Sequence, residues 1–373
     1  MGSRTIYMKT KRYLYASCVL LLCLFASCIK DEPLYMEADI VDFKFADSIY
    51  VSTSVQGDSL VYIMVKGGTD VSNLAPFEVV ISPNATIEPS IDSAQNFKRD
   101  VIYKVTSEDG LKVKSYTVRV TFPPSALKFD FEDWELTSTW RYPSYQDPNY
   151  PMWNSANTGA ALLYGNKAGF LYPTRDTTDA YSGNKAALLE TLKGSDKPIL
   201  GMKAYILPGN LFTGVFGLSL KAIKFGSIIN IEETGKPLEM TGYYKYTPGE
   251  IFTIEGQPIE GTRVDKCDIY AVLYQVTKGK EGESESLNGT DIKTDETRVV
   301  ARAVVRDEDK APTDVYKPFR AEFKYVKTID PDKYGYKLAI ILSSSEAGDV
   351  FEGALGSKLT IDEIEVKLDD YRK

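Results

Sequence analysis

The sequence predicts an all-β protein, with an immunoglobulin-like sandwich followed by a larger β-sandwich of jelly-roll type. Apolar residues occur in short runs of strand length that are bounded by turn residues, and no amphipathic helix of convincing length interrupts them. The length of 373 residues predicts two or three domains, at roughly 100–200 residues each. We therefore expect two β domains behind an N-terminal leader.

Residues 1–27 are typical of a secretory signal. Lys9, Lys11 and Arg12 precede an apolar run that ends at Ala26 and is too short to span a bilayer as a helix. The run leads into Ala26-Ser27-Cys28, which resembles the lipobox of bacterial lipoproteins. That resemblance implies a lipid on Cys28 and membrane attachment through it. A plain secretory signal with an incidental cysteine is the alternative.

Residues 28–35 form the predicted tether between this leader and the first domain. Its Lys30-Asp31-Glu32 resembles the export signal of surface-exposed lipoproteins in some Gram-negative bacteria. The resemblance implies an outer-membrane protein displayed on the cell surface. A merely solvated tether would have the same composition.

Residues 36–122 are predicted to form the immunoglobulin-like sandwich. The runs 60–65 and 77–81 are strands, Asp109-Gly110 signals a hairpin turn, and residues 116–120 alternate between apolar and polar. The block resembles the small immunoglobulin-like spacers at the N-terminus of many bacterial surface lipoproteins. No catalytic groups gather in it, so we interpret it as a stalk.

Residues 123–126 are the predicted linker, because Pro123 and Pro124 favour an extended, semi-rigid chain. The second domain, residues 127–373, again has only strand-like runs. The run 267–276 is apolar at nearly every position, as in a strand covered on both faces, whereas the polar stretch 278–296 reads as a solvated loop.

Composition excludes several classes of chemistry. The chain has no histidine, which excludes the Ser-His-Asp triad and the usual imidazole base. Three of its four cysteines lie in the first 28 residues and only Cys267 lies elsewhere, so neither a zinc cluster nor a disulfide framework is expected. The net charge of -8 argues against nucleic acid as a partner.

Five segments of the second domain together resemble the putative carbohydrate metabolism domain, a family of surface lipoproteins in glycan-degrading Gram-negative bacteria. The segments are residues 131–134 (FEDW), 153–159 (WNSANTG), 208–214 (PGNLFTG), 242–249 (GYYKYTPG) and 268–274 (DIYAVLY). The resemblance runs from about Lys128 to the C-terminus. It implies a jelly roll similar to carbohydrate-binding modules and carbohydrate as the substrate class, but no mechanism.

The tryptophans predict where a sugar would bind, since aromatic faces cover the C–H side of a pyranose ring and polar groups hold its hydroxyls. Trp134 follows an alternating strand and is expected in the core, whereas Trp140 and Trp153 flank a loop rich in Tyr, Pro, Asp and Asn. The alternative is that all three rings pack inside the sandwich. The predicted carbohydrate-binding residues are Trp140, Trp153, Asn154, Asn157, Arg175 and Asp176.

Two further constellations concern carboxylates. Glu132 in the opening strand and Asp362 in the closing strand are candidate ligands of a structural Ca²⁺, the only cofactor we consider, although two solvent-facing acids are the favoured interpretation. A catalytic pair for glycoside hydrolysis would come from Glu132, Asp133, Asp176, Asp179 and Glu190, but no spacing singles out two of them.

These observations favour a lipid-anchored outer-surface protein that binds glycans or helps to process them without catalysing a reaction. Its expected partners are an oligo- or polysaccharide, the membrane and glycan-uptake proteins. A glycoside hydrolase or lyase that uses a carboxylate pair is the first alternative. A structural or adhesive protein without a sugar site is the second.

Overall fold

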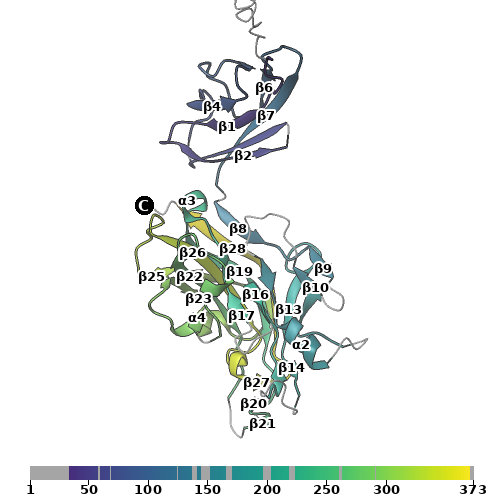
Figure 1. Ribbon diagram of the computed structural model, residues 1–373. Coiled ribbons are helices and arrows are strands. Elements are labelled where there is room, and N and C mark those ends of the chain that lie inside the picture. The colour runs from purple at the N-terminus through teal and green to yellow at the C-terminus, as the bar shows by residue number, and fades with distance from the viewer. Residues whose placement is uncertain are drawn as a thin grey trace, which may run out of the picture. The chain divides into compact units, whose positions relative to one another are not determined.

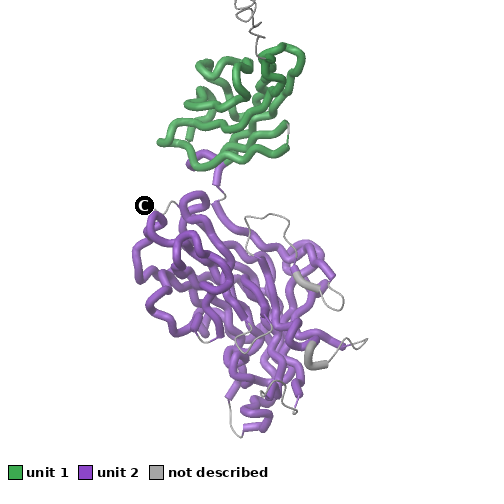
Figure 2. The backbone as a smooth tube through the Cα atoms, in the orientation of Figure 1, with its two compact units in different colours: residues 1–63, 68–121 green, residues 64–67, 122–373 purple. Residues whose placement is uncertain are grey.

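The computed structural model describes residues 33–57, 59–67, 69–123, 125–136, 141–143, 152–164, 170–195, 203–217, 223–259, 263–289 and 291–369. They fall into two compact units: residues up to 63 together with 68–121, and residues 64–67 together with those from 122 onward (Figure 2). Strands dominate both units, which confirms the predicted all-β class (Figure 1). Within the described residues, no helix combines the length and the apolar character needed to cross a bilayer.

The N-terminal unit is a sandwich of two sheets. In one sheet β1 (Ile40–Lys44) pairs antiparallel with β4 (Glu78–Ile81). The other has the order β2 (Tyr50–Gln56), β3 (Leu60–Val65), β7 (Val113–Thr121), β6 (Val101–Thr106) and β5 (Thr86–Glu88). Phe43 of β1 contacts Tyr103 of β6 edge to face, with ring centroids 5.3 Å apart, so side chains of both sheets meet in one core.

The C-terminal unit is built from two larger sheets (Figure 1). The six-stranded sheet has the order β12 (Thr174–Thr177), β13 (Ala186–Glu190), β28 (Lys358–Asp369), β19 (Lys236–Thr247) and β24 (Thr313–Glu322), with β8 (Ala126–Phe129) paired to β28. The eight-stranded sheet has the order β11 (Trp153–Asn154), β16 (Asn210–Phe216), β26 (Tyr334–Ser343), β22 (Asp268–Thr277), β23 (Val299–Val304) and β25 (Lys324–Tyr325), with β17 (Ile223–Phe225) on β16 and β18 (Ser227–Ile228) on β26.

Shorter elements connect these strands. The additional strands are β9 (Trp134–Leu136), β10 (Arg141–Pro143), β14 (Leu192–Lys193), β15 (Ile206–Leu207), β20 (Phe252–Ile254), β21 (Gln257–Pro258) and β27 (Gly353–Ala354). The described helices are α2 (Asn157–Tyr164), α3 (Ile231–Thr234), α4 (Asp291–Thr294) and the 3₁₀ turns η1 (Glu283–Glu285), η2 (Asp307–Lys310) and η3 (Gly348–Val350).

The main core lies between the two large sheets, and a second core lies on the other face of the eight-stranded sheet. Strand β22 contributes to both, because Ile269 and Leu273 belong to the main core while Tyr270 and Tyr274 belong to the second. This double coverage explains its almost continuous apolar sequence. The interpretation of residues 278–296 as a solvated loop was wrong in part, since Leu287 and Ile292 are buried in the second core.

Candidate functional site

The predicted aromatic platform is not an open surface in this structure. The ring of Trp153 is only 2% exposed, and it packs edge to face on Phe129, with ring centroids 5.1 Å apart, and beside Phe131 at 5.6 Å. A sugar cannot reach either face of that ring, which corrects its assignment as a stacking residue. Trp134 is also buried, and its indole N–H donates to the Phe131 carbonyl at 2.6 Å. Trp140 lies outside the described residues.

The predicted asparagine partners hold the backbone rather than a ligand. Asn157 is buried; its Nδ2 donates to the Thr174 carbonyl at 2.6 Å, and its Oδ1 accepts from the Thr174 N–H at 3.1 Å. The Oδ1 of Asn154 accepts from the N–H of Ser155 at 2.9 Å. These amides satisfy backbone groups that would otherwise be buried without partners.

The predicted charged partners lie on the edge strand β12. Arg175 forms an ion pair with Glu190 and also donates to the Tyr172 carbonyl at 3.0 Å. Asp176 is 3.9 Å from the Lys185 ammonium. Since Trp153 belongs to the core, those of the predicted sugar-binding residues that the structure describes do not come together in one open site.

Glu132 and Asp362, in contrast, are brought together by residues 178–185, which we call the Tyr181 loop. Asp362 Oδ2 accepts from the N–H groups of Tyr181 at 2.8 Å and Ser182 at 3.1 Å. Glu132 Oε1 accepts from the N–H groups of Asn184 at 2.7 Å and Lys185 at 3.0 Å. The two carboxylates therefore bind successive parts of one loop.

This arrangement changes the role expected for the two acids. Calcium needs a shell of oxygen ligands, whereas here backbone donors already occupy one oxygen of each carboxylate. The described residues contain no group of three or more Asp, Glu, Cys or His side chains placed to hold a metal ion. In this structure both carboxylates hold the Tyr181 loop, and a structural Ca²⁺ at this place stays a prediction.

Burial and these hydrogen bonds act on the two carboxyl groups in opposite directions. Burial raises the pKa of Asp362 to about 6, although the N–H groups of Ser182, Tyr181 and Glu363 favour its ionised form. Burial also opposes ionisation of Glu132, but hydrogen bonds from Lys185 and Asn184 outweigh it and lower the pKa of that carboxyl.

The loop places Tyr181 on the outer face of the six-stranded sheet. Its ring stacks on Tyr243 of β19, with centroids 3.6 Å apart and planes inclined by 12°, and Tyr316 of β24 meets it edge-on at 5.7 Å. In β19 the side chains alternate, so that Tyr244 and Tyr246 are buried while Tyr243 faces outward. We call Tyr181, Tyr243 and Tyr316 the tyrosine cluster.

Lys245 and Asp179 hold the Tyr316 ring of this cluster in place. The Lys245 ammonium lies 4.6 Å from the centroid of Tyr316 and forms an ion pair with Asp179. The Tyr316 hydroxyl donates to the Asp179 carbonyl at 2.6 Å. Burial raises the pKa of Tyr316, so its hydroxyl remains a donor at neutral pH.

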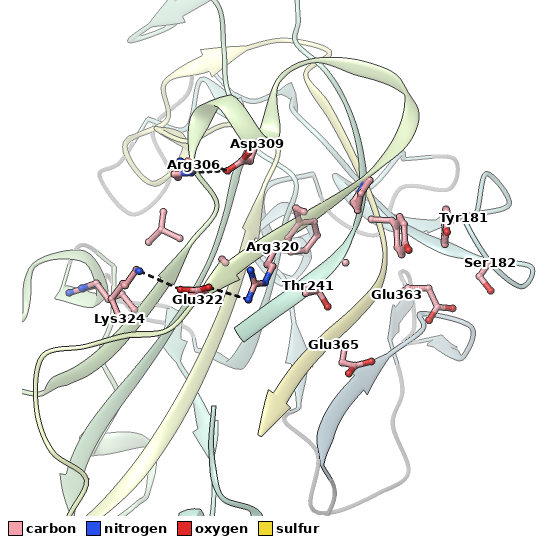
Figure 3. A pocket seen from close by; sticks show the side chains of 17 residues that line it. Tyr181, Ser182, Thr241, Arg306, Asp309, Arg320, Glu322, Lys324, Glu363 and Glu365 are labelled. Atoms are coloured by element: carbon pink, nitrogen blue, oxygen red, sulfur yellow. Dashed lines mark hydrogen bonds and ion pairs between the residues drawn. The ribbon is translucent and has the colours of Figure 1, made fainter. Parts of the chain in front are cut away.

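A groove of about 1170 Å³ is lined by two members of the tyrosine cluster and by residues of β19 and β24, among them Thr241 and Arg320 (Figure 3). Tyr181 and Tyr243 line it, whereas Phe319 borders it from below with only 3% of the residue exposed, as part of the main core. Its charged lining residues are Arg302, Arg306, Asp309, Arg320, Glu322, Lys324, Glu363 and Glu365. An aromatic surface beside charged and hydroxyl groups is the chemistry that a carbohydrate site requires.

Sequence reasoning missed this site although part of its signal was present. The alternation around Tyr243 indicates one outward-facing tyrosine, and the segment 242–249 is one of the five that carry the family resemblance. Tyr181 is far from Tyr243 along the chain, however, and only the folded sheet brings the two rings together.

Comparisons with known proteins point to carbohydrate. The profile of the putative carbohydrate metabolism domain matches residues 130–367, and a profile described as "SGBP, N-terminal" matches residues 40–120. No curated protein matches the chain.

Two solved structures are similar along most of their own lengths. A protein described as a putative glycoside hydrolase from Bacteroides thetaiotaomicron is 33% identical, with 91% of this chain and 99% of that chain covered and a TM-score of 0.57. A second protein with the same description, from Bacteroides vulgatus, is 31% identical, with 65% and 98% covered and a TM-score of 0.54.

Proposed function

The chain belongs to the putative carbohydrate metabolism domain family, and from this premise we propose that its C-terminal unit binds a glycan at the tyrosine cluster. The observation that carries the proposal is the position of Tyr181. Its ring stacks on Tyr243 beside an open groove, yet 47% of the residue remains exposed. The ring face turned away from Tyr243 can receive the C–H face of a pyranose.

Preorganisation supports this proposal. Hydrogen bonds to Glu132 and Asp362 hold the loop that carries Tyr181, so the ring does not have to be ordered when a ligand arrives. Loss of an aromatic contact of this kind weakens binding by about 1–3 kcal/mol in comparable interfaces.

Binding without catalysis fits the groove better than hydrolysis does. Glycoside hydrolysis needs two carboxyl groups on opposite sides of the scissile bond. Glu363 and Glu365 both come from β28 and line the same wall of the groove (Figure 3). The other two carboxylates of the groove, Asp309 and Glu322, are already held in ion pairs with arginine and lysine side chains. A glycoside hydrolase remains the second candidate, because the two solved relatives are described as putative glycoside hydrolases.

We place the protein on the outer surface of the cell, anchored by a lipid on Cys28. The lipobox-like sequence before Cys28 supports the anchor. The match of the N-terminal unit to the N-terminal domain of surface glycan-binding proteins (SGBP) supports surface display. In this arrangement the N-terminal unit acts as a spacer, and captured glycan passes to uptake proteins.

A glycan panel tests the proposal. The chain without its predicted signal is titrated with the panel, and both glycan retention and product release are measured. Tyr181→Ala should weaken binding of the best ligand by about 5- to 150-fold. Tyr50→Ala, which changes a half-exposed tyrosine of the N-terminal unit, is the matched control and should leave the affinity unchanged. Full affinity in Tyr181→Ala would exclude the tyrosine cluster, and product release would favour the hydrolase.

A further inference from the structure

Glu363 occupies an irregular position in β28, directly beside the tyrosine cluster. Thr241 of β19 pairs with Glu365, whereas Tyr243 pairs with Asp362, so two residues of β28 lie opposite the single residue Gly242. The extra residue forms a β-bulge, and Glu363 adopts a left-handed conformation with φ 49°. Side-chain-bearing residues seldom adopt this conformation, and bulges commonly redirect a side chain next to a functional site.

The bulge gives β28 two successive carboxylates outside the apolar core, of which Asp362 is buried beneath the Tyr181 loop. Ile361 and Ile364 on either side of them are buried in the main core. Asp362 accepts hydrogen bonds from the Tyr181 loop. Glu363 instead lines the groove together with Tyr181 (Figure 3). Its carboxylate therefore borders the same groove as the exposed aromatic ring.

The other charged side chains of the groove already have partners. Arg320 forms ion pairs with Glu239 at 2.6 Å and with Glu322 at 3.1 Å. The remaining contacts are Lys324 with Glu322 at 3.5 Å, Arg306 with Asp309 at 2.8 Å, Glu365 with Lys128 at 3.3 Å, and Arg302 with the Ile292 carbonyl at 2.7 Å. Among the described residues, none donates a hydrogen bond to the Glu363 carboxylate or forms an ion pair with it.

We propose that the Glu363 carboxylate accepts hydrogen bonds from two neighbouring hydroxyls of the sugar stacked on Tyr181. It thereby selects neutral glycans over glycans that carry uronate or sulfate groups. This inference rests on the proposed function and adds the substrate class. An ionised carboxylate is an acceptor only, with two oxygens that suit a pair of adjacent O–H donors. When a sugar covers it, the charge must be hydrogen-bonded, whereas an anionic group at the same place would be repelled.

The inference is tested with two sets of oligosaccharides. Cello-, manno- and xylo-oligosaccharides represent neutral glycans, and oligogalacturonate and chondroitin sulfate represent anionic ones. We expect the tightest ligand to be neutral. Glu363→Gln keeps the size of the side chain but removes its charge, so affinity for that ligand should fall at least about tenfold, and the preference over anionic glycans should shrink.

Two further variants test whether the loss of affinity is specific to the Glu363 carboxylate. Glu352→Gln removes a carboxylate that is paired with Arg263 and does not line the groove, and affinity should change by less than about twofold. Glu363→Gly removes the carboxylate and relieves the left-handed backbone, so it should fold and bind as weakly as Glu363→Gln. Unchanged affinity in both Glu363 variants, or an anionic glycan as the tightest ligand, would overturn the proposal.

Tyr181→Ala separates this inference from the function on which it rests. If Tyr181→Ala loses affinity while Glu363→Gln does not, the tyrosine platform stands and the selective role of Glu363 is wrong. If both variants bind normally, the site lies elsewhere and both proposals fail. Both also fail if neither set of oligosaccharides binds the unaltered chain.

Discussion

Burial separates two groups of aromatic side chains in the C-terminal unit. Trp153 is enclosed by Phe129 and Phe131, whereas Tyr181 keeps about half of its surface exposed. Residues of the first group contribute to stability and residues of the second can contribute to binding. Composition alone could not distinguish them, because tryptophan and tyrosine are suited to both positions.

The first prediction at this scale concerns Trp153. Trp153→Ala should lower the free energy of unfolding by about 3–5 kcal/mol, because it leaves a large cavity in the main core. Trp153→Phe keeps a ring and should cost much less, since the indole N–H has no hydrogen-bond partner among the described residues. Urea denaturation measures both values. A loss of glycan affinity in stably folded Trp153→Ala would contradict the assignment of this ring to the core.

The second residue-scale prediction uses the pKa of Asp362, which is raised to about 6. The unfolded value is about 3.9, so the folded state holds this proton more tightly and gains stability from it at low pH. That contribution is fully present below about pH 4 and is lost as the pH rises through about 6. Asp362→Asn cannot ionise and lacks this dependence.

The measurement is urea denaturation of both proteins between pH 4 and 7. The stability of Asp362→Asn relative to the unaltered protein should rise across this interval by up to about 3 kcal/mol. Comparing the two proteins at each pH cancels the titration of the other carboxyl groups. A difference that stays constant with pH would show that Asp362 does not titrate in this range.

The sequence identified Glu132 and Asp362 as a pair, but not the groups that they bind. Pairing was foreseeable, because the opening and closing strands of a jelly roll are neighbours, and β8 does pair with β28. The loop donors were not foreseeable, because backbone N–H groups carry no sequence signature. The sequence left a structural Ca²⁺ and, as the favoured interpretation, two solvent-facing acids. In the fold Asp362 is buried, and both carboxylates accept hydrogen bonds from the Tyr181 loop.

At the scale of elements, period-two alternation predicted the strands well and the loops poorly. Strand β19 shows why: its buried and outward residues can be read directly from the sequence, and Tyr243 could be placed on the outer face. The Tyr181 loop has no such pattern. Its place over β19 depends on its hydrogen bonds to Glu132 and Asp362, which come from distant parts of the chain.

Gly183 provides the test of this loop. Its φ is +65°, and a Cβ there would lie 2.1 Å from Glu132 Oε1. Gly183→Ala should therefore displace the Glu132 carboxylate, break its hydrogen bonds to Asn184 and Lys185, loosen the loop that carries Tyr181 and weaken glycan binding. Gly279→Ala is the matched control, because Gly279 has a φ of +77° with nothing within 4 Å of the added Cβ.

The control variant isolates backbone strain, which should lower the free energy of unfolding by about 1–2 kcal/mol without affecting glycan affinity. Calorimetric titration and urea denaturation of both variants separate the two effects. If Gly183→Ala binds glycan as tightly as Gly279→Ala does, the loop is not needed to position Tyr181.

At the scale of the whole molecule, each unit has its own hydrophobic core, and the two units divide the proposed tasks. The tyrosine cluster and the groove are formed by residues of the C-terminal unit. The N-terminal unit has strands and a core but contributes no residue to that groove. The role of the N-terminal unit as a stalk stays a prediction.

Because the two proposed tasks belong to different units, the lipid anchor and glycan binding can be tested separately. Cys28 follows the small residues Ala26 and Ser27 at the end of a short apolar run, which predicts lipidation there. We expect Cys28→Ser either to leave the membrane fraction or to accumulate as an unprocessed precursor, as fractionation and the mass of the intact protein would show. Cys23→Ser, inside the apolar run, is the matched control and should remain anchored.

Because the groove lies in the other unit, purified Cys28→Ser should bind glycan with unchanged affinity. Normal processing and membrane retention of Cys28→Ser would rule out Cys28 as the lipidated residue.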